Sequence, residues 1–69
     1  MRTVDARGLI CPLPLVKTKL AFESLAPGGT LLVLATDPEA PIDLAGWADQ
    51  HGHAFRERAP GVYELTKAG

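Results

Sequence analysis

The sequence predicts an α/β (α+β) two-layer sandwich: a four-stranded mixed sheet with two helices on one face. Three observations lead to this class: two segments with helical apolar spacing, the apolar run "LLVLA" between them, and the turn "APG" near the C-terminal end. A strand–helix–strand beginning requires parallel strands joined by a right-handed crossover. A tight turn between two strands makes an antiparallel hairpin. The predicted order is therefore βαβαββ, with both helices packed on the same face.

The first strand is expected at residues 2–5, and Gly8 allows a turn after it. A helix is expected from Pro12 to about Leu25. Pro12 suits the first helical position because the N–H there would be unpaired, and Pro14 still lies within the first turn. At 100° per residue, one arc of this helix forms the expected core face. That face comprises Pro14, Leu15, Thr18, Ala21, Phe22 and Leu25.

The run "LLVLA" at residues 31–35 is expected to be an interior strand buried on both faces, because it contains no polar residue. After the turn-rich "DPEAP" of residues 37–41, a second helix is expected at 42–51. Strands at 53–58 and 62–66 then complete the hairpin. The second helix has its apolar face at i, i+3, i+4 and i+7. The members of that face are Leu44, Trp47, Ala48 and His51.

Length and composition predict one domain, residues 1–69, whose stability comes from its apolar core. The chain has 69 residues, of which 46% are hydrophobic, and one cysteine, so an internal disulfide or a thiolate cluster for structural zinc is excluded. We recognise no signal peptide or membrane span, and a free thiol is typical of the cytoplasm. The net charge of −1 provides no large basic face. We therefore expect a monomer that binds neither nucleic acid nor membrane directly.

Cys11 stands directly before Pro12, where the first predicted helix begins. Free N–H groups and the positive end of the helix dipole stabilise a thiolate at such a place, so the pKa of the thiol is expected to fall below about 8.5. The turn at Gly8 and the stiff prolines at 12 and 14 fix the direction in which the sulfur projects. A lone cysteine is more often a small buried hydrophobe, but its place between a glycine turn and a proline argues against that alternative.

The sequence predicts no second thiol and no histidine–acid pair that could assist Cys11 in catalysis. A second cysteine is missing, which excludes a CxxC redox cycle, and His51 and His53 are expected to be partly buried rings. These features favour a carrier of a covalent sulfur adduct over a self-sufficient catalyst.

The segment "DARGLICPLPLVKTK" resembles the opening of the TusA/SirA-like small sulfurtransferases, which carry a CPxP motif after an Asp–x–x–Gly–Leu turn. The likeness continues through "LAPGGTLLVLATDP", Asp43-Leu44, Trp47 and "GH" at 52–53, and covers nearly the whole chain. The resemblance implies a βαβαββ fold and a sulfur carrier that takes sulfane sulfur on Cys11 as a persulfide. It also implies a sulfur donor of the cysteine desulfurase or rhodanese type. The acceptor would serve tRNA thiolation, molybdenum-cofactor synthesis or sulfur oxidation, and no metal or organic cofactor is implied.

The chain departs from the family pattern at Leu13, where the best-known tRNA-thiolation members carry an acid, and at Leu20, where many relatives carry a base. With Val16, these residues form a second apolar stripe opposite the core face. We hypothesise that the stripe docks a sulfur donor or acceptor, although a solvent-facing leucine or two is ordinary. The candidate partner contacts are Arg7, Leu13, Val16, Lys17, Lys19 and Leu20.

Asp37 and Asp43 also belong to the family pattern, but each has an ordinary structural explanation. Asp37 precedes a proline in a turn, and Asp43 is an acid in the first turn of a helix. Two other functions stay open. A regulatory or protein-binding module would keep its biological effect in Cys11→Ala, whereas an RNA-binding sheet is disfavoured by near-neutral charge and the lack of a basic aromatic platform.

Overall fold

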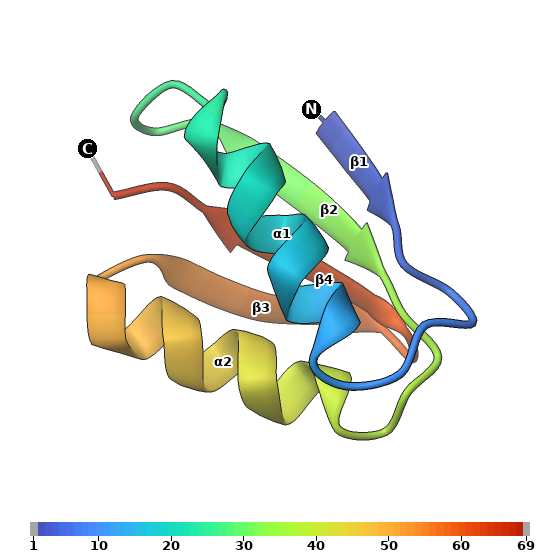
Figure 1. Cartoon of the computed structure of the whole chain (residues 1–69). Helices are drawn as coiled ribbons and strands as arrows, with labels where there is room; N and C mark the ends of the chain where they lie inside the picture. Colours follow the sequence, from blue (N-terminus) through green and yellow to red (C-terminus); the bar gives the residue numbers. More distant parts are fainter. Residues whose placement is uncertain (1, 69) are drawn as a thin grey trace.

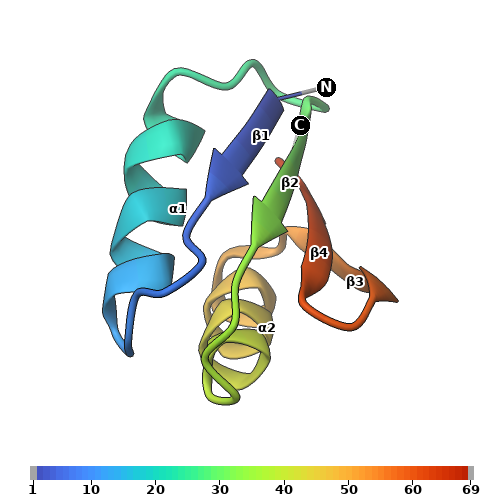
Figure 2. The same cartoon turned by 90° about the vertical axis from the view of Figure 1, so that its right-hand side faces the viewer.

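The computed structural model describes residues 2–68 and has the predicted element order, βαβαββ. The elements are β1 (Arg2–Asp5), α1 (Leu13–Glu23), β2 (Thr30–Leu34), α2 (Ala40–His51), β3 (Ala54–Ala59) and β4 (Val62–Thr66). The predicted fold class is confirmed. The strand order in the sheet is β1-β2-β4-β3, with β1 and β2 parallel and the two remaining pairs antiparallel. Both helices cover the same face of this sheet (Figure 1; Figure 2).

Strand β2 lies inside the sheet, but only one of its faces is fully buried. Leu31 and Val33 have no exposed surface and face the helices, whereas Leu32 and Leu34 are half-buried on the opposite face. The expectation that both faces would be buried was wrong. A two-layer fold has no second helical layer to cover the far side of the sheet, so alternate residues of an apolar strand stay partly in contact with water.

The core face of α1 agrees with the sequence prediction. Pro14, Thr18, Ala21 and Phe22 are buried, while Leu15 and Leu25 are partly buried against the core. Thr18 is polar, but its hydroxyl donates a hydrogen bond of 2.9 Å to the Pro14 carbonyl and is therefore satisfied. The helix begins at Leu13, with Pro12 as its N-cap, so Cys11 lies outside the helix.

Helix α2 begins two residues earlier than predicted, and its buried residues are Ala40, Leu44 and Ala48. Trp47 is half-buried and packs edge-on against Phe22, with ring centroids 4.9 Å apart. The prediction that His51 belongs to the core face was wrong. His51 is exposed because it occupies the last turn of α2, where its ring lies 5.7 Å from that of Trp47. Within residues 2–68, neither helix has the length and apolar character needed to cross a bilayer.

His53 is half-buried and lies just before β3, which begins at Ala54. It does not start the strand as predicted. Its Nδ1 accepts a hydrogen bond of 3.0 Å from the Ala68 N–H. Burial, followed by the nearby His51 and Lys67, lowers the pKa of His53. The neutral ring is therefore a structural part of this end of the fold.

Replacing the buried Leu44 by alanine should destabilise the protein by about 2–5 kcal/mol, because a cavity is left between α2 and the sheet. Ile42→Ala is the matched control on the same helix, since 68% of Ile42 is exposed, and it should change the free energy of unfolding by less than about 0.5 kcal/mol. Urea unfolding measures both. Equal losses would contradict the packing described above.

Candidate functional site

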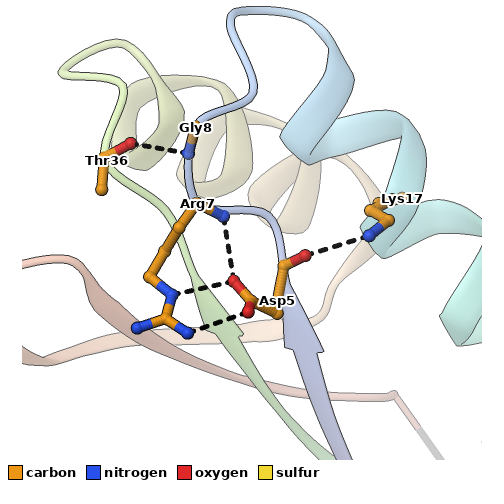
Figure 3. Close-up of polar contacts among 5 residues, drawn as sticks. All are labelled: Asp5, Arg7, Gly8, Lys17 and Thr36. Carbon is orange, nitrogen blue, oxygen red and sulfur yellow. Dashed lines mark hydrogen bonds and ion pairs between the residues drawn. The ribbon is translucent and has the colours of Figure 1, made fainter.

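The candidate site lies where the loop of residues 6–12, here called the Cys11 loop, meets the loop between β2 and α2 (Figure 1). Parallel pairing brings the carboxyl ends of β1 and β2 to the same edge of the sheet, and the two loops leave from there. The Gly8 N–H donates to Thr36 Oγ1 over 2.9 Å (Figure 3). The Cys11 N–H donates to Asp37 Oδ2 over 2.6 Å. The Cys11 loop is therefore fastened to its neighbour at two points.

Gly8 has a φ of +82°, a backbone conformation that residues with a Cβ atom rarely adopt. A Cβ added there would meet no atom within 4 Å, so conformation is the reason for glycine at this position. The expected turn at Gly8 is confirmed. At the other end of the loop, the peptide bond between Cys11 and Pro12 is cis, and Pro14 is buried in the first turn of α1.

The Cys11 side chain is exposed, and its Sγ donates a hydrogen bond of 2.6 Å to Asp43 Oδ2. Asp43 is half-buried in the first turn of α2. The Asp37 carboxylate accepts hydrogen bonds from the backbone N–H groups of Cys11 and Glu39, which lowers its pKa. We refer to Asp37, Glu39 and Asp43 as the acidic group. These three residues surround the only thiol of the chain with negative charge.

The acidic group raises the pKa of Cys11 to about 11. The hydrogen bond to Asp43 is the largest cause, followed by burial and by repulsion from the three carboxylates. The predicted lowering of this pKa by the helix N-terminus was therefore wrong. Helix α1 begins at Leu13, beyond Cys11, and a carboxylate in contact with the sulfur outweighs the more distant helix dipole.

Arg7 and Lys17, the two basic residues nearest to the motif in the sequence, both bond to Asp5 (Figure 3). The Arg7 guanidinium makes two 2.9 Å bonds to the Asp5 carboxylate, which lower the pKa of Asp5 to about 2. The Lys17 ammonium donates to the Asp5 carbonyl over 3.0 Å. Lys19 is exposed on α1. Arg7 and Lys17 thus stabilise the end of β1, and their role in partner binding stays a prediction.

The predicted apolar stripe, Leu13, Val16 and Leu20, lies in solvent. Their exposed fractions are 46%, 44% and 62%, as a docking surface requires. Two further apolar side chains that the sequence analysis did not single out are more exposed still: Ile10 at 71% in the Cys11 loop and Ile42 at 68% on α2. The thiol therefore has exposed apolar neighbours in the sequence on both sides, at Ile10 and Leu13.

Cys11, Glu39 and Asp43 are also the residue types that bind metal ions, and their ligand atoms lie within 4.8 Å of one another. A surface thiol beside two carboxylates does not by itself make a metal site. The expectation that the protein needs no metal or organic cofactor stays a prediction.

Comparison with known proteins decides the family. The family described as "Sulfurtransferase TusA" matches residues 2–66. The chain belongs to the TusA family. It is 44% identical to the putative sulfur carrier protein YrkI of Bacillus subtilis over 57 residues, which covers 83% of this chain and 76% of YrkI. It is 39% identical to the sulfur carrier protein TusA of Allochromatium vinosum over 54 residues, which covers 78% of this chain and 71% of that protein.

The crystal structure of a SirA-like protein from Desulfitobacterium hafniense has the same fold, with a TM-score of 0.73 and 32% sequence identity. The match covers 96% of this chain and 93% of that one. The TusA family therefore accounts for both the sequence and the architecture. Within this family fold, Cys11 is exposed in a loop that is held by hydrogen bonds to Thr36 and Asp37.

Sequence reasoning did not find the contact between Asp43 and the Cys11 sulfur. The two residues are 32 positions apart, and the first-turn position of Asp43 gave it a sufficient structural role. The available signal was that Asp37 and Asp43 both belong to the family pattern. Asp37 combines the two roles, because it makes the predicted turn and also holds the Cys11 backbone.

Asp43→Asn should lower the pKa of Cys11 from about 11 toward the ordinary value of about 8.5, because it removes the carboxylate that accepts the thiol proton. At pH 8 the rate of alkylation by iodoacetamide should rise by about tenfold or more. The rate measured from pH 6 to pH 12 gives the pKa. Asp49→Asn, an exposed acid at the other end of α2, is the control and should leave the profile unchanged. An unshifted profile in Asp43→Asn would refute the assignment.

Proposed function

We propose that this sulfur carrier accepts sulfane sulfur on Cys11 as a persulfide and passes it to an acceptor protein. The main support is the exposure of the Cys11 thiol within a loop that Asp37 and Thr36 hold in place, in a chain of the TusA family. Exposure lets a second protein reach the sulfur, and the fastened loop keeps the sulfur at a fixed position, which lowers the entropic cost of transfer.

The transfer needs no oxidant. The Cys11 thiolate attacks the terminal sulfur of a donor persulfide and forms a new S–S bond. The bond between the two donor sulfurs breaks, and its electron pair stays on the donor cysteine, which leaves as a thiolate and takes up a proton. Transfer to the acceptor repeats the exchange in the other direction, so sulfur moves with no net redox change.

The proposed partners are a sulfur donor of the cysteine desulfurase or rhodanese type and a sulfur acceptor. tRNA thiolation, molybdenum-cofactor synthesis and sulfur oxidation are the candidate pathways, and Leu13 in place of an acid disfavours the first of them. The apolar stripe on α1 is the proposed docking surface, because it is exposed and begins two residues after Cys11. A free thiol favours the cytoplasm as the compartment, and we propose that the carrier acts as a monomer without direct contact to nucleic acid or membrane.

Incubation with thiosulfate, polysulfide, or a cysteine desulfurase with cysteine should add one sulfur atom to the intact protein. A reductant should remove the added mass, and Cys11→Ser should not acquire it, because no other cysteine is present. Intact-mass spectrometry measures the gain. If no donor of any class yields the adduct, the carrier mechanism is wrong and a regulatory or protein-binding role becomes the better explanation.

Val16→Asp should slow sulfur uptake from a protein donor at least severalfold, because it puts a charge in the middle of the apolar stripe. Uptake from polysulfide should be unchanged, since a small donor needs no docking surface. Ala26→Asp, at another exposed apolar position in the loop after α1, serves as the matched control. Circular dichroism verifies the fold of both variants. Equal uptake by Val16→Asp and the wild type would exclude the stripe as the interface.

A further inference from the structure

The acidic group creates a problem for a protein whose work requires a thiolate. With the pKa of Cys11 at about 11, only about one molecule in 10⁴ carries the thiolate at pH 7. The cations that could offset this charge are committed elsewhere, since Arg7 and Lys17 both bond to Asp5. Among residues 2–68, the sulfur has one hydrogen-bond partner, and that partner is a carboxylate.

From this arrangement we propose that the sulfur-transfer partner presents a positively charged side chain next to its own reactive sulfur. That side chain pairs with Asp43 and Glu39 when the two proteins dock, and so releases the Cys11 proton. This inference rests on the proposed function and identifies the kind of partner that the site fits: a protein surface with a lysine or arginine beside the reactive sulfur, and apolar groups around it.

Charge complementarity is the first argument for such a partner. Carboxylate atoms of Glu39 and Asp43 lie within 4.8 Å of the Cys11 sulfur, so a group that approaches the sulfur for in-line attack also approaches both acids. A partner without a cation would bury these carboxylates unpaired, at considerable cost. A partner persulfide anion without a cation would meet direct repulsion.

The neighbouring apolar side chains supply the second argument. Ile10 and Leu13 flank Cys11 in the sequence, and Ile42 precedes Asp43; within residues 2–68, all three are exposed large apolar side chains. Docking on these residues removes water from the thiol and the acids, and charge interactions strengthen in the drier contact. The binding of a partner cation is therefore coupled to the activation of the thiol.

Two reagents of opposite charge test the charge preference without any partner protein. The probes are the methanethiosulfonates that carry a 2-(trimethylammonium)ethyl group or a 2-sulfonatoethyl group. The Cys11 thiolate attacks the thiosulfonate sulfur, a disulfide forms, and methanesulfinate leaves. The ratio of the two rates cancels the thiolate fraction, which is common to both reagents, and so isolates the local charge from the pKa.

We expect the ratio of the cationic to the anionic reaction rate to be about tenfold or more higher for Cys11 than for N-acetylcysteinamide. This excess should disappear in 1 M salt. Asp43→Asn and Glu39→Gln should each reduce the ratio severalfold, and Asp49→Asn should not. A ratio equal to that of the blocked amino acid, a preference for the anionic reagent, or a ratio unaffected by both variants would overturn the proposal.

Peptide persulfides then test the partner chemistry itself. A peptide with a lysine on each side of its persulfidated cysteine should load Cys11 at least severalfold faster than the same peptide with glutamates. Glu39→Gln should reduce this difference between the two loading rates. Equal rates from the two peptides would overturn the proposal. If the reagents show the expected charge preference but no peptide and no small donor loads sulfur, the carrier function fails while the charge preference stands. If both peptides load Cys11 and the reagents show no preference, the function stands and the inference fails.

Discussion

The parallel pairing of β1 with β2 is the constraint on which the candidate site depends. It brings the carboxyl ends of both strands to one edge of the sheet, so the two loops that follow them lie next to each other. Three contacts then join residues that are 26 to 32 positions apart in the sequence. They link Gly8 to Thr36, the Cys11 backbone to Asp37, and the Cys11 sulfur to Asp43. Helix α2 contributes Asp43 to the site, whereas β3 and β4 contribute none of the residues named above.

Two electrostatic influences compete at Cys11, and their distances decide the outcome. The start of α1 offers partial positive charge, but the effect of a helix terminus falls off within one turn, and the helix begins beyond the cysteine. Asp43 carries a full charge and contacts the sulfur at 2.6 Å. A full charge in contact prevails over a fractional charge farther away, which explains why an exposed thiol in this position keeps its proton.

The element order and the core face of α1 were predictable because they depend on local periodicity. The core face of α1 follows from the spacing of its apolar residues, and the hairpin follows from the turn at residues 59–61. Properties that depend on tertiary packing were not predictable in the same way. The open face of β2 reflects the number of layers, His51 is exposed because its helix extends past the core, and the contact between Cys11 and Asp43 requires the packing of α2 beside the Cys11 loop.

The hydrogen bond between Cys11 and Asp43 also bears on how sulfur would be carried. In the persulfide that we propose, the outer sulfur takes the place of the Sγ proton, so Sγ can no longer donate to Asp43. The empty and loaded carriers must then differ at Asp43, whose carboxylate is bonded to the thiol in the first state and free of it in the second. In the proposed complex, a cation on the docked partner stabilises this freed carboxylate, so a partner with such a cation should load Cys11 faster than a donor without one.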